Sequence, residues 1–282
     1  MTTGALKYYQ SIGQLTLGGN LSDDVKNSIE SPKVDRHGKT AQSFMITSGI
    51  SQHISPCTLY YIDTIGCKLI MSEMRRISDS TRHTATPESP PRLHAKGRWD
   101  SASAEDVPDG NILGGCGKLI LEGNVLQIPE APATAEMFAY YGAVLLKDGD
   151  SVVHTAGVDL PVCSMHIGSE YAKEYLLVAE YGGGAYLETH DRPHLHMPCN
   201  EGAAGYMILG RRTIEADGSF ELSAYRIPYG YALYTPPEVV HCDAFLKGDY
   251  MCVYSCTKNY STYLIRDTNN ACVDVQIVPA RD

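Results

Sequence analysis

The sequence lacks the features that mark secreted, membrane-spanning or nucleic-acid-binding proteins. No window approaches the roughly 18 uninterrupted apolar residues of a membrane span. The N-terminus, MTTGALKYYQSIGQL, has neither the basic start nor the apolar run of a signal peptide, so we expect a cytoplasmic protein. The formal net charge of -10 argues against nucleic acid as a partner, because phosphate binding needs clustered Lys and Arg.

Several common catalytic patterns are also missing. No Gly-x-Gly-x-x-Gly or Walker-type loop and no Gly-x-Ser-x-Gly occurs, which disfavours nucleotide binding and serine hydrolysis. There is no Cys-x-x-Cys among the nine cysteines, and an odd number prevents complete pairing. In a chain expected in the cytoplasm, we interpret the cysteines as buried free thiols, including Cys199 and Cys242 beside candidate metal ligands.

What the sequence does contain is typical of an all-β protein. Over residues 111–167, short apolar runs alternate with Gly, Pro and Asp-Gly at intervals near ten residues, the spacing of a β-sandwich or barrel. Residues 50–77 predict two strands, and the polar, proline-bearing residues 78–110 predict a long surface loop. No helix longer than about three turns is predicted.

Local signals add detail to this pattern. Asp148-Gly149 in LKDGDSVV and Asp217-Gly218 further on predict two hairpins, because Asp-Gly tolerates the positive φ of a primed turn. EYAKEYLLVAEY predicts one helical turn followed by a strand, and Ser22 caps a predicted short helix that ends before Pro32.

Histidines and a carboxylate gather in two segments, residues 184–210 and residues 230–245. The candidate metal ligands are His194, His196, Glu201 and His241. Alternate residues of a strand face one side, so the His-x-His pair presents two imidazoles together, and a facing strand adds the third. Imidazole nitrogen and carboxylate oxygen suit Fe, Zn, Mn, Ni or Cu. His190 is an alternative ligand or a catalytic residue that reaches the substrate.

Other side chains near these segments are candidates for the pocket wall. Tyr206 and Arg226 lie on predicted strands and are our catalytic candidates, with an outward-facing position as the alternative. Asp243 shares the face of the preceding histidine and could orient a ligand or water. Glu188 and Arg192 are interpreted as surface residues or a local pair, although Arg192 could bind a substrate carboxylate.

His194-x-His196, followed after four residues by Glu201, resembles the first motif of the cupin superfamily, and Gly230–His241 resembles the second. The resemblance implies a cupin-type double-stranded β-helix, or jelly-roll barrel, in which three histidines and a glutamate hold one divalent metal. It covers about 60 to 70 residues. The sequence departs from the motifs at Glu238, where the family has glycine.

The resemblance suggests a division of the chain. Residues 1–44 are an N-terminal extension, and residues 151–282 are the metal-binding cupin domain. Gly123–Thr134 keeps the spacing of the second motif with threonine in place of the metal histidine, so residues 45–150 are a candidate metal-free barrel of a bicupin. In the alternative, there is one barrel, and residues 1–110 are extra strands and loops wrapped around it.

Three functions follow from this resemblance. The first is an Fe(II)-type oxygenase acting on a small organic metabolite. The second is an isomerase, epimerase or lyase that uses Zn, Mn or Ni as a Lewis acid on a sugar-acid-like substrate. The third is a non-catalytic binding protein. We expect one divalent metal ion, with Fe(II) first, an anionic or polyhydroxylated small-molecule substrate, no membrane partner and a homodimer.

Overall fold

The computed structural model describes most of the chain. The described residues are 36–37, 43–72, 85–102, 115–154, 159–180, 183–213, 219–253 and 260–280. Most of them lie in strands, and the helices among them are α3 (Ala135–Tyr140) and the π-helix η2 (Tyr171–Leu176). The prediction of a mainly β protein is thereby confirmed. None of the described helices is long and apolar enough to cross a membrane. The predicted helix at Ser22 lies outside the described residues.

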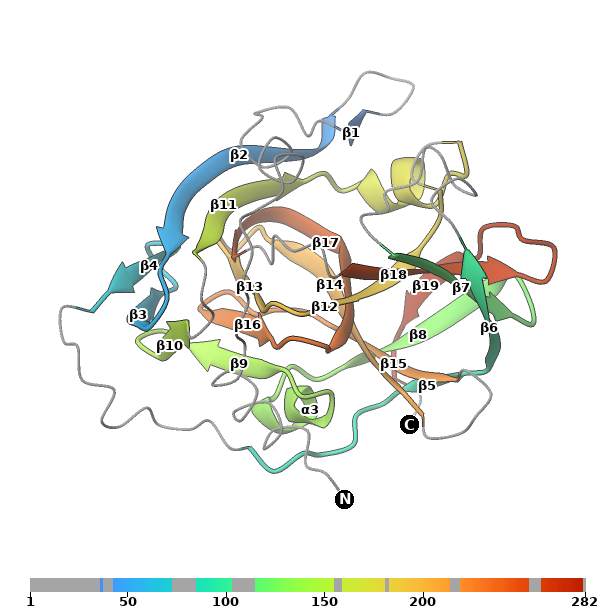
Figure 1. Ribbon diagram of the computed structural model, residues 1–282, viewed down its shortest axis with the longest axis horizontal. Coiled ribbons are helices and arrows are strands. Elements are labelled where there is room, and N and C mark those ends of the chain that lie inside the picture. Colours follow the sequence, from blue (N-terminus) through green and yellow to red (C-terminus); the bar gives the residue numbers. More distant parts are fainter. Residues whose placement is uncertain are drawn as a thin grey trace.

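Strand β17 (Val240–Val253) is the centre of the fold, and it curves around the middle of the molecule (Figure 1). Its first half pairs with β14 (Ala204–Arg212) and β12 (Tyr186–His190). Its second half pairs with β11 (Leu160–Ile167) and β13 (His194–Pro198). Because one bent strand belongs to both halves, it fixes β12 and β13 relative to each other.

The strands beyond β11 and β13 extend one side of the sheet. β11 pairs with β2 (Ser43–Ile54), which pairs with β1 (Arg36–His37). β13 pairs with β16 (Tyr231–Thr235), which pairs with β9 (Val144–Lys147). β13 is therefore held between β16 and β17, and its five residues are all buried.

The strands beyond β14 and β12 extend the other side. β14 forms an antiparallel hairpin with β15 (Phe220–Tyr225), as predicted, although its Asp217-Gly218 tip lies outside the described residues. The outer strands on this side are β5 (Leu93–Ala95) and β8 (Val125–Ala131) beside β15, β19 (Asp274–Val278) beside β8, β18 (Tyr260–Asp267) beside β12, β7 (Gly115–Leu121) beside β18, and β6 (Gly97–Ala102) beside β7.

These pairings join both predicted cupin segments in one 16-stranded sheet. β2, β5, β7, β8 and β9, from residues 45–150, each pair with a strand from residues 151–282, so strand pairing marks no boundary between the two segments. Among the described residues the paired strands branch from β17 and do not close into a ring. The cupin-type jelly-roll barrel stays a prediction.

A small second sheet lies against the outer face of β13. It consists of β10 (Ser151–His154), β3 (Thr58–Asp63) and β4 (Lys68–Met71). Its buried side chains, Tyr60 among them, pack with Leu195 and Met197 in a second hydrophobic core. β13 thus turns its apolar residues toward the small sheet, which leaves its alternate residues, both histidines, facing the interior of the large sheet.

Three local predictions need correction, and one helix was not predicted. Asp148-Gly149 does form a turn, but β9 and β10 pair with β16 and β3 and do not form a hairpin with each other. The strand expected after η2 is not formed by the described residues there. β5 and β6 interrupt the predicted loop over 78–110, because their edges are completed by distant strands. Helix α3 was missed, although Thr134 caps it by accepting from the Met137 amide.

The interpretation of all the cysteines as free thiols is also wrong. Cys67 and Cys199 form a disulfide across 132 residues of sequence. The described thiols of Cys242 and Cys252 are buried, as expected, and burial raises the pKa of both thiols well above the usual value.

Candidate metal centre

Three strands each bring two ionisable side chains to one place in the interior. The pairs are Glu188 and His190 of β12, His194 and His196 of β13, and His241 and Asp243 of β17. The members of each pair are two residues apart, so the alternation of a strand puts both on the same face. Five of the six are between 0% and 7% exposed, and the Asp243 side chain is 14% exposed.

Four of these side chains form one group that could hold a metal ion. The potential ligand atoms of Glu188, His190, His194 and His241 all lie within 4.8 Å of one another. Glu188 Oε1 is 3.1 Å from His241 Nε2, and His190 Nε2 is 3.3 Å from the same nitrogen. The ring centroids of His190 and His194 are 4.2 Å apart. One carboxylate and three imidazoles therefore converge on one point.

The other two side chains are hydrogen-bonded to each other beside this group. His196 Nε2 lies 3.1 Å from Asp243 Oδ2, and the Tyr186 hydroxyl donates to Asp243 Oδ1 at 3.5 Å. The ring centroids of His194 and His196 are 5.5 Å apart, so the two groups are in contact through His194. His194, His196 and Asp243 are themselves a second combination that could hold a metal.

Backbone carbonyls set the direction of two rings. His190 Nδ1 donates to the Arg192 carbonyl at 2.5 Å, and His241 Nδ1 donates to the Val239 carbonyl at 2.9 Å. Since a carbonyl only accepts, Nδ1 carries the proton in both rings. A neutral ring then presents the lone pair of Nε2 to the cluster, which is the form that binds a metal.

The interior makes two of the imidazoles strongly resistant to protonation. Burial lowers the pKa of His190 and of His194 well below the usual value, and the charges of neighbouring histidines lower both further. At neutral pH both rings are neutral. No proton has to leave them before they can bind a cation.

The two carboxylates behave differently. Burial raises the pKa of Glu188, although the hydrogen bond and charge of His241 oppose this. Burial alone would lower the pKa of His241, but the hydrogen bond and charge of Glu188 outweigh it and raise that pKa. Burial would raise the pKa of Asp243, yet the His196 hydrogen bond and charge hold it at about 2. Glu188 and His241 thus share a proton, and Asp243 is ionised.

These residues fit a divalent cation. Metal–ligand bonds of about 2.0–2.2 Å place ligand atoms roughly 3 to 4.4 Å apart, close to the spacing within 4.8 Å found here. One divalent charge would offset Glu188 and Asp243, which removes the cost of two buried negative charges. His196 Nδ1, in the second combination, is buried and has no hydrogen-bond partner among the described residues, so it is available to a ligand.

The structure places His194 and His241 in one group with His190, whereas His196, predicted as a ligand beside them, belongs to a second combination with His194 and Asp243. It does not bring Glu201 to the cluster, because this residue lies exposed on the turn after β13. Glu188, interpreted from the sequence as a surface residue, is buried there instead. Its spacing to His190 repeats the His-x-His spacing, and this was the signal that could have identified it.

Tyr206 and Arg226 make their contacts elsewhere. The Tyr206 hydroxyl donates to Glu130 Oε2 at 2.9 Å, and Arg226 Nε donates to Glu130 Oε1 at 3.0 Å. The Arg226 guanidinium lies 4.3 Å from the centroid of the Tyr206 ring, and its side chain is 54% exposed. These contacts form a surface cluster around Glu130, so the structure does not place the two residues among the histidines. Arg192 is buried in the turn between β12 and β13 and is not a surface residue.

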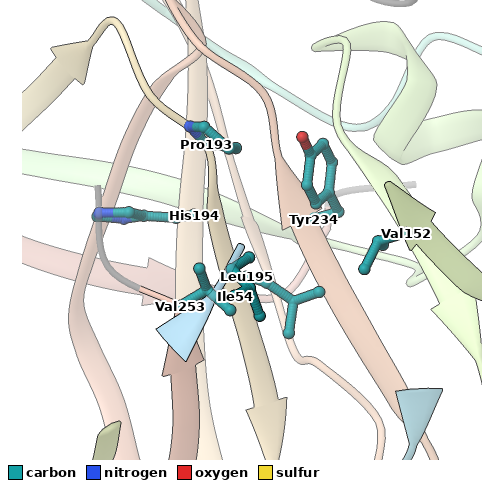
Figure 2. Close-up of a pocket in the computed structure, with 7 residues that line it drawn as sticks. All are labelled: Ile54, Val152, Pro193, His194, Leu195, Tyr234 and Val253. Atoms are coloured by element: carbon teal, nitrogen blue, oxygen red, sulfur yellow. The ribbon is translucent and has the colours of Figure 1, made fainter. Parts of the chain in front are cut away.

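A small cavity adjoins β13 but does not open on the imidazoles. Its volume is ≈ 20 Å³, about enough for one water molecule. It is lined by Ile54, Val152, Pro193, His194, Leu195, Tyr234 and Val253. Figure 2 shows the imidazole of His194 pointing away from Tyr234 and Val152. The cavity therefore belongs to the apolar outer side of β13.

No protein-family model matches the chain, and no curated protein sequence matches it. The inference about function therefore depends on the buried cluster of histidines and carboxylates on β12, β13 and β17.

Proposed function

We propose that this protein is an enzyme whose active centre is one divalent metal ion bound between β12, β13 and β17. The ligands in this proposal are Glu188, His190, His194 and His241. The observation that carries it is the convergence of these four buried side chains, with ligand atoms within 4.8 Å. Buried ionisable groups are costly unless they are paired or bind a metal, and they concentrate at functional sites.

The protein holds this set of ligands ready before any ion arrives. The ladder between β12 and β17 places Glu188 opposite His241, and carbonyl contacts orient the rings of His190 and His241. Because these positions are set by the backbone, an ion enters a site that needs little rearrangement. Four ligands leave two positions of an octahedral ion for other molecules.

We propose that the reaction is the oxygenation of a small anionic or polyhydroxylated metabolite. Bound Fe(II) supplies redox chemistry toward dioxygen at such a centre, and histidine with carboxylate is the ligand type of non-haem iron enzymes. In this chain, the four ligand side chains are between 0% and 7% exposed, so bulk water has little access to the proposed centre. The His196–Asp243 pair, next to the ligand His194, provides a hydrogen-bonding group toward a substrate.

The His196–Asp243 pair also supports a second candidate, an isomerase, epimerase or lyase with a Lewis-acid metal. Such reactions move a proton to or from carbon beside a polarised oxygen. His196 is held by a carboxylate 3.1 Å away, which is the arrangement of a proton-transferring histidine oriented by an acid. The cupin resemblance is compatible with both candidates, and the cupin barrel and the homodimer remain part of the proposal.

Metal analysis of the purified protein tests the proposal and separates the candidates. The full chain is produced without added metal, and its bound elements are measured per chain. About one equivalent of iron with substrate-dependent oxygen uptake supports the oxygenase. Zinc or manganese without oxygen dependence supports the isomerase or lyase. No bound metal, even after reconstitution with Fe(II), Zn(II) and Mn(II), contradicts both and supports the non-catalytic alternative.

Two variants sharpen this test. His194→Ala removes a residue shared by both possible metal groups, so we expect metal binding to be lost. His94→Ala is the matched control, because the His94 side chain is 54% exposed and lies 3.5 Å from Glu221, outside the cluster. A full equivalent of metal in His194→Ala would contradict the ligand assignment.

A further inference from the structure

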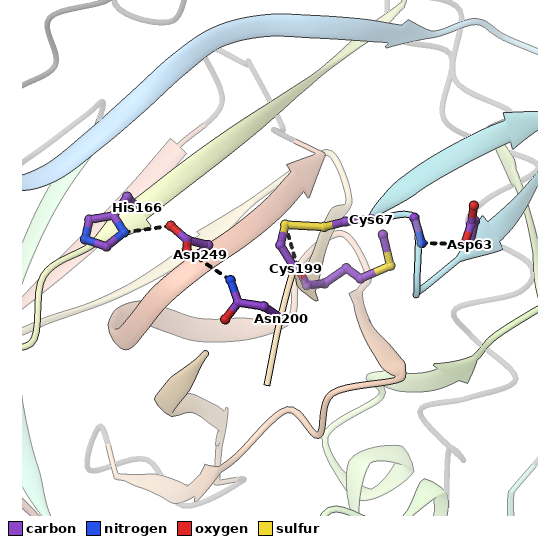
Figure 3. Close-up of a disulfide and its surroundings, with 8 residues drawn as sticks. Asp63, Cys67, His166, Cys199, Asn200 and Asp249 are labelled. Carbon is purple, nitrogen blue, oxygen red and sulfur yellow. Dashed lines mark hydrogen bonds and ion pairs between the residues drawn. A yellow bond between two sulfur atoms is a disulfide. The ribbon is translucent and has the colours of Figure 1, made fainter. Parts of the chain in front are cut away.

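The disulfide between Cys67 and Cys199 connects the small sheet to the strand that carries two of the clustered histidines. Cys67 lies in the turn between β3 and β4, and Cys199 directly follows β13. His196 is only three residues before Cys199 in the sequence. Figure 3 shows the disulfide bridging these two segments. A covalent bond thus anchors the C-terminal end of β13, the strand that carries His194 of the proposed metal centre.

The same two segments also meet through apolar packing. Leu195 and Met197 lie on the outer face of β13 and are buried against Tyr60, Ile62 and Leu69 of the small sheet. The histidines occupy the alternate positions of β13 on its inner face. A shift of the small sheet would therefore move the outer side chains and, with them, the ring of His196. Packing alone is non-directional, whereas the disulfide fixes the register between the segments.

The turn that carries Cys67 is held in an unfavourable backbone conformation. Cys67 has a φ of 49°, in the left-handed region that residues with a Cβ rarely adopt. The Gly66 amide donates to Asp63 Oδ1 at 2.6 Å, and the Thr64 amide donates to Asp148 Oδ1 at 2.8 Å. Such conformations persist only where the surroundings impose them, and the disulfide is one of these constraints. When the disulfide is reduced, one of the constraints that hold Cys67 in this left-handed conformation is removed.

The end of β13 has noncovalent constraints of its own. The Cys199 amide donates to the Asp249 carbonyl at 2.9 Å, and Asn200 Nδ2 donates to Asp249 Oδ2 at 3.0 Å. His166 Nδ1 lies 2.7 Å from Asp249 Oδ1, as Figure 3 shows. His166 and Asn200 are exposed, so this network is open to water. It keeps Cys199 near its place when the disulfide is opened, which allows the bond to form again.

Both cysteines are within reach of a reductant. Each is half-buried, and the neighbouring Gly66 and Asn200 are exposed. A disulfide at the surface is open to attack by a thiolate, whereas one sealed in a core is not.

We propose that Cys67–Cys199 is a reversible redox clamp on the metal-binding strand. A dithiol reductant attacks one sulfur as the thiolate, forms a mixed disulfide, and is released as a cyclic disulfide when its second thiol closes. The two cysteines gain two electrons and two protons, and the reductant loses them. In the oxidised state the clamp holds β13 against the small sheet. In the reduced state β13 loosens and the centre loses its ion faster. The metal readout rests on the proposed function.

Cobalt release from the full chain tests the clamp. Oxidised and reduced protein, the latter prepared with dithiothreitol and desalted without oxygen, are loaded with Co(II), a coloured probe. The loss of absorbance is followed after addition of EDTA. We expect Co(II) to leave the reduced protein about tenfold faster, within the usual range of coupling between two sites. Equal rates in the two states would overturn the proposal.

Two variants separate the clamp from other thiol effects. Cys67→Ser/Cys199→Ser should release Co(II) at the fast rate with or without reductant. Cys57→Ser is the matched control, because Cys57 is an exposed thiol next to the same small sheet and also has a positive φ, 55°. It should keep the full difference between the two states. Loss of that difference in Cys57→Ser would overturn the assignment to Cys67 and Cys199.

Failure of the metal centre can be told apart from failure of the clamp. If the oxidised protein takes up no Co(II), the proposed function is wrong. The clamp is then judged in the metal-free protein by amide hydrogen exchange over residues 194–198. Exchange at least about fivefold faster after reduction supports the clamp, and unchanged exchange overturns it.

Discussion

Glu188 lies directly opposite His241 in the ladder between β12 and β17, and its Oε1 is 3.1 Å from His241 Nε2. Directly opposed residues of antiparallel strands have Cβ atoms about 4.5–5.5 Å apart, so the backbone alone keeps these two side chains in contact. The carboxylate is thus built into the fold next to the histidines. This relationship makes Glu188, and not Glu201, the acidic ligand in our proposal.

We expect Glu188→Gln to weaken metal binding at least about tenfold, because the amide keeps the size of the side chain but removes its charge. Glu201→Gln is the matched control, since it makes the same change on the exposed turn after β13. Isothermal titration with Co(II) at neutral pH measures both. Weak binding in Glu201→Gln with normal binding in Glu188→Gln would show that Glu201, the glutamate of the cupin-like motif, is the acidic ligand.

Metal binding should release a proton from the centre. The pKa of His241 is raised, because the hydrogen bond and charge of Glu188 outweigh the effect of burial, and an ion must displace the proton they share. His190 and His194, whose pKa values are lowered, are already neutral and release no proton when an ion binds. We therefore expect affinity to fall about tenfold per pH unit below the raised pKa. Titration calorimetry in buffers of different ionisation enthalpy counts the protons, and a count of zero would contradict the shared proton.

The metal-free protein should lose stability as the pH falls below about 6.5. The pKa values of His190 and His194 are lowered in the fold, so below the usual value the unfolded chain binds more protons than the folded one. The free energy of unfolding should then fall by up to about 2.7 kcal/mol per pH unit. His241 opposes this fall only near the usual histidine pKa, because its raised pKa keeps the folded ring protonated while the unfolded chain is still taking up its proton.

Urea unfolding between about pH 7 and pH 5 measures this slope. His190→Gln should reduce it by about half, because one of the two titrating rings is removed. A stability that is independent of pH over this range would show that the two rings are not buried as neutral groups.

Gly205 in β14 allows a close approach between two strands, and Gly205→Ala should be strongly destabilising. An added Cβ would lie 2.2 Å from the Phe245 carbonyl oxygen of β17, and φ is +79°. Gly149→Ala is the matched control, because Gly149 has a φ of +78° and open space around its Cα. We expect Gly149→Ala to cost about 1 kcal/mol and Gly205→Ala at least about 2 kcal/mol more. Equal unfolding free energies would contradict the close approach.

The sequence predicts the histidine side of the centre for a simple reason. The spacing of His194 and His196 fixes their common face as soon as the segment is a strand, and β13 is one. Glu188 has the same spacing to His190. The sequence prediction names Glu201 instead of Glu188, because Glu201 occupies the glutamate position of the first cupin motif, although it follows the strand. Local periodicity was the better guide to which carboxylate is inside.

What the sequence does not predict depends on distant pairing. Nine cysteines allow many disulfides, and nothing local connects Cys67 with Cys199 across 132 residues. β5 and β6 are short and lie in polar surroundings, so only their partners β15 and β7 define them as strands. The Asp148-Gly149 turn was read correctly, but the strands beside it find better partners elsewhere.

The position of β17 decides when the centre can form during synthesis. The residues of β12 and β13 leave the ribosome well before Val253, yet both strands are hydrogen-bonded to β17. Until that strand has emerged, the nascent chain lacks both His241 and the scaffold that holds β12 beside β13, and domains generally fold only once their parts are complete. Loading of the proposed centre with an ion would therefore have to follow the synthesis of β17, and the growing polypeptide could not capture metal there before that strand has emerged.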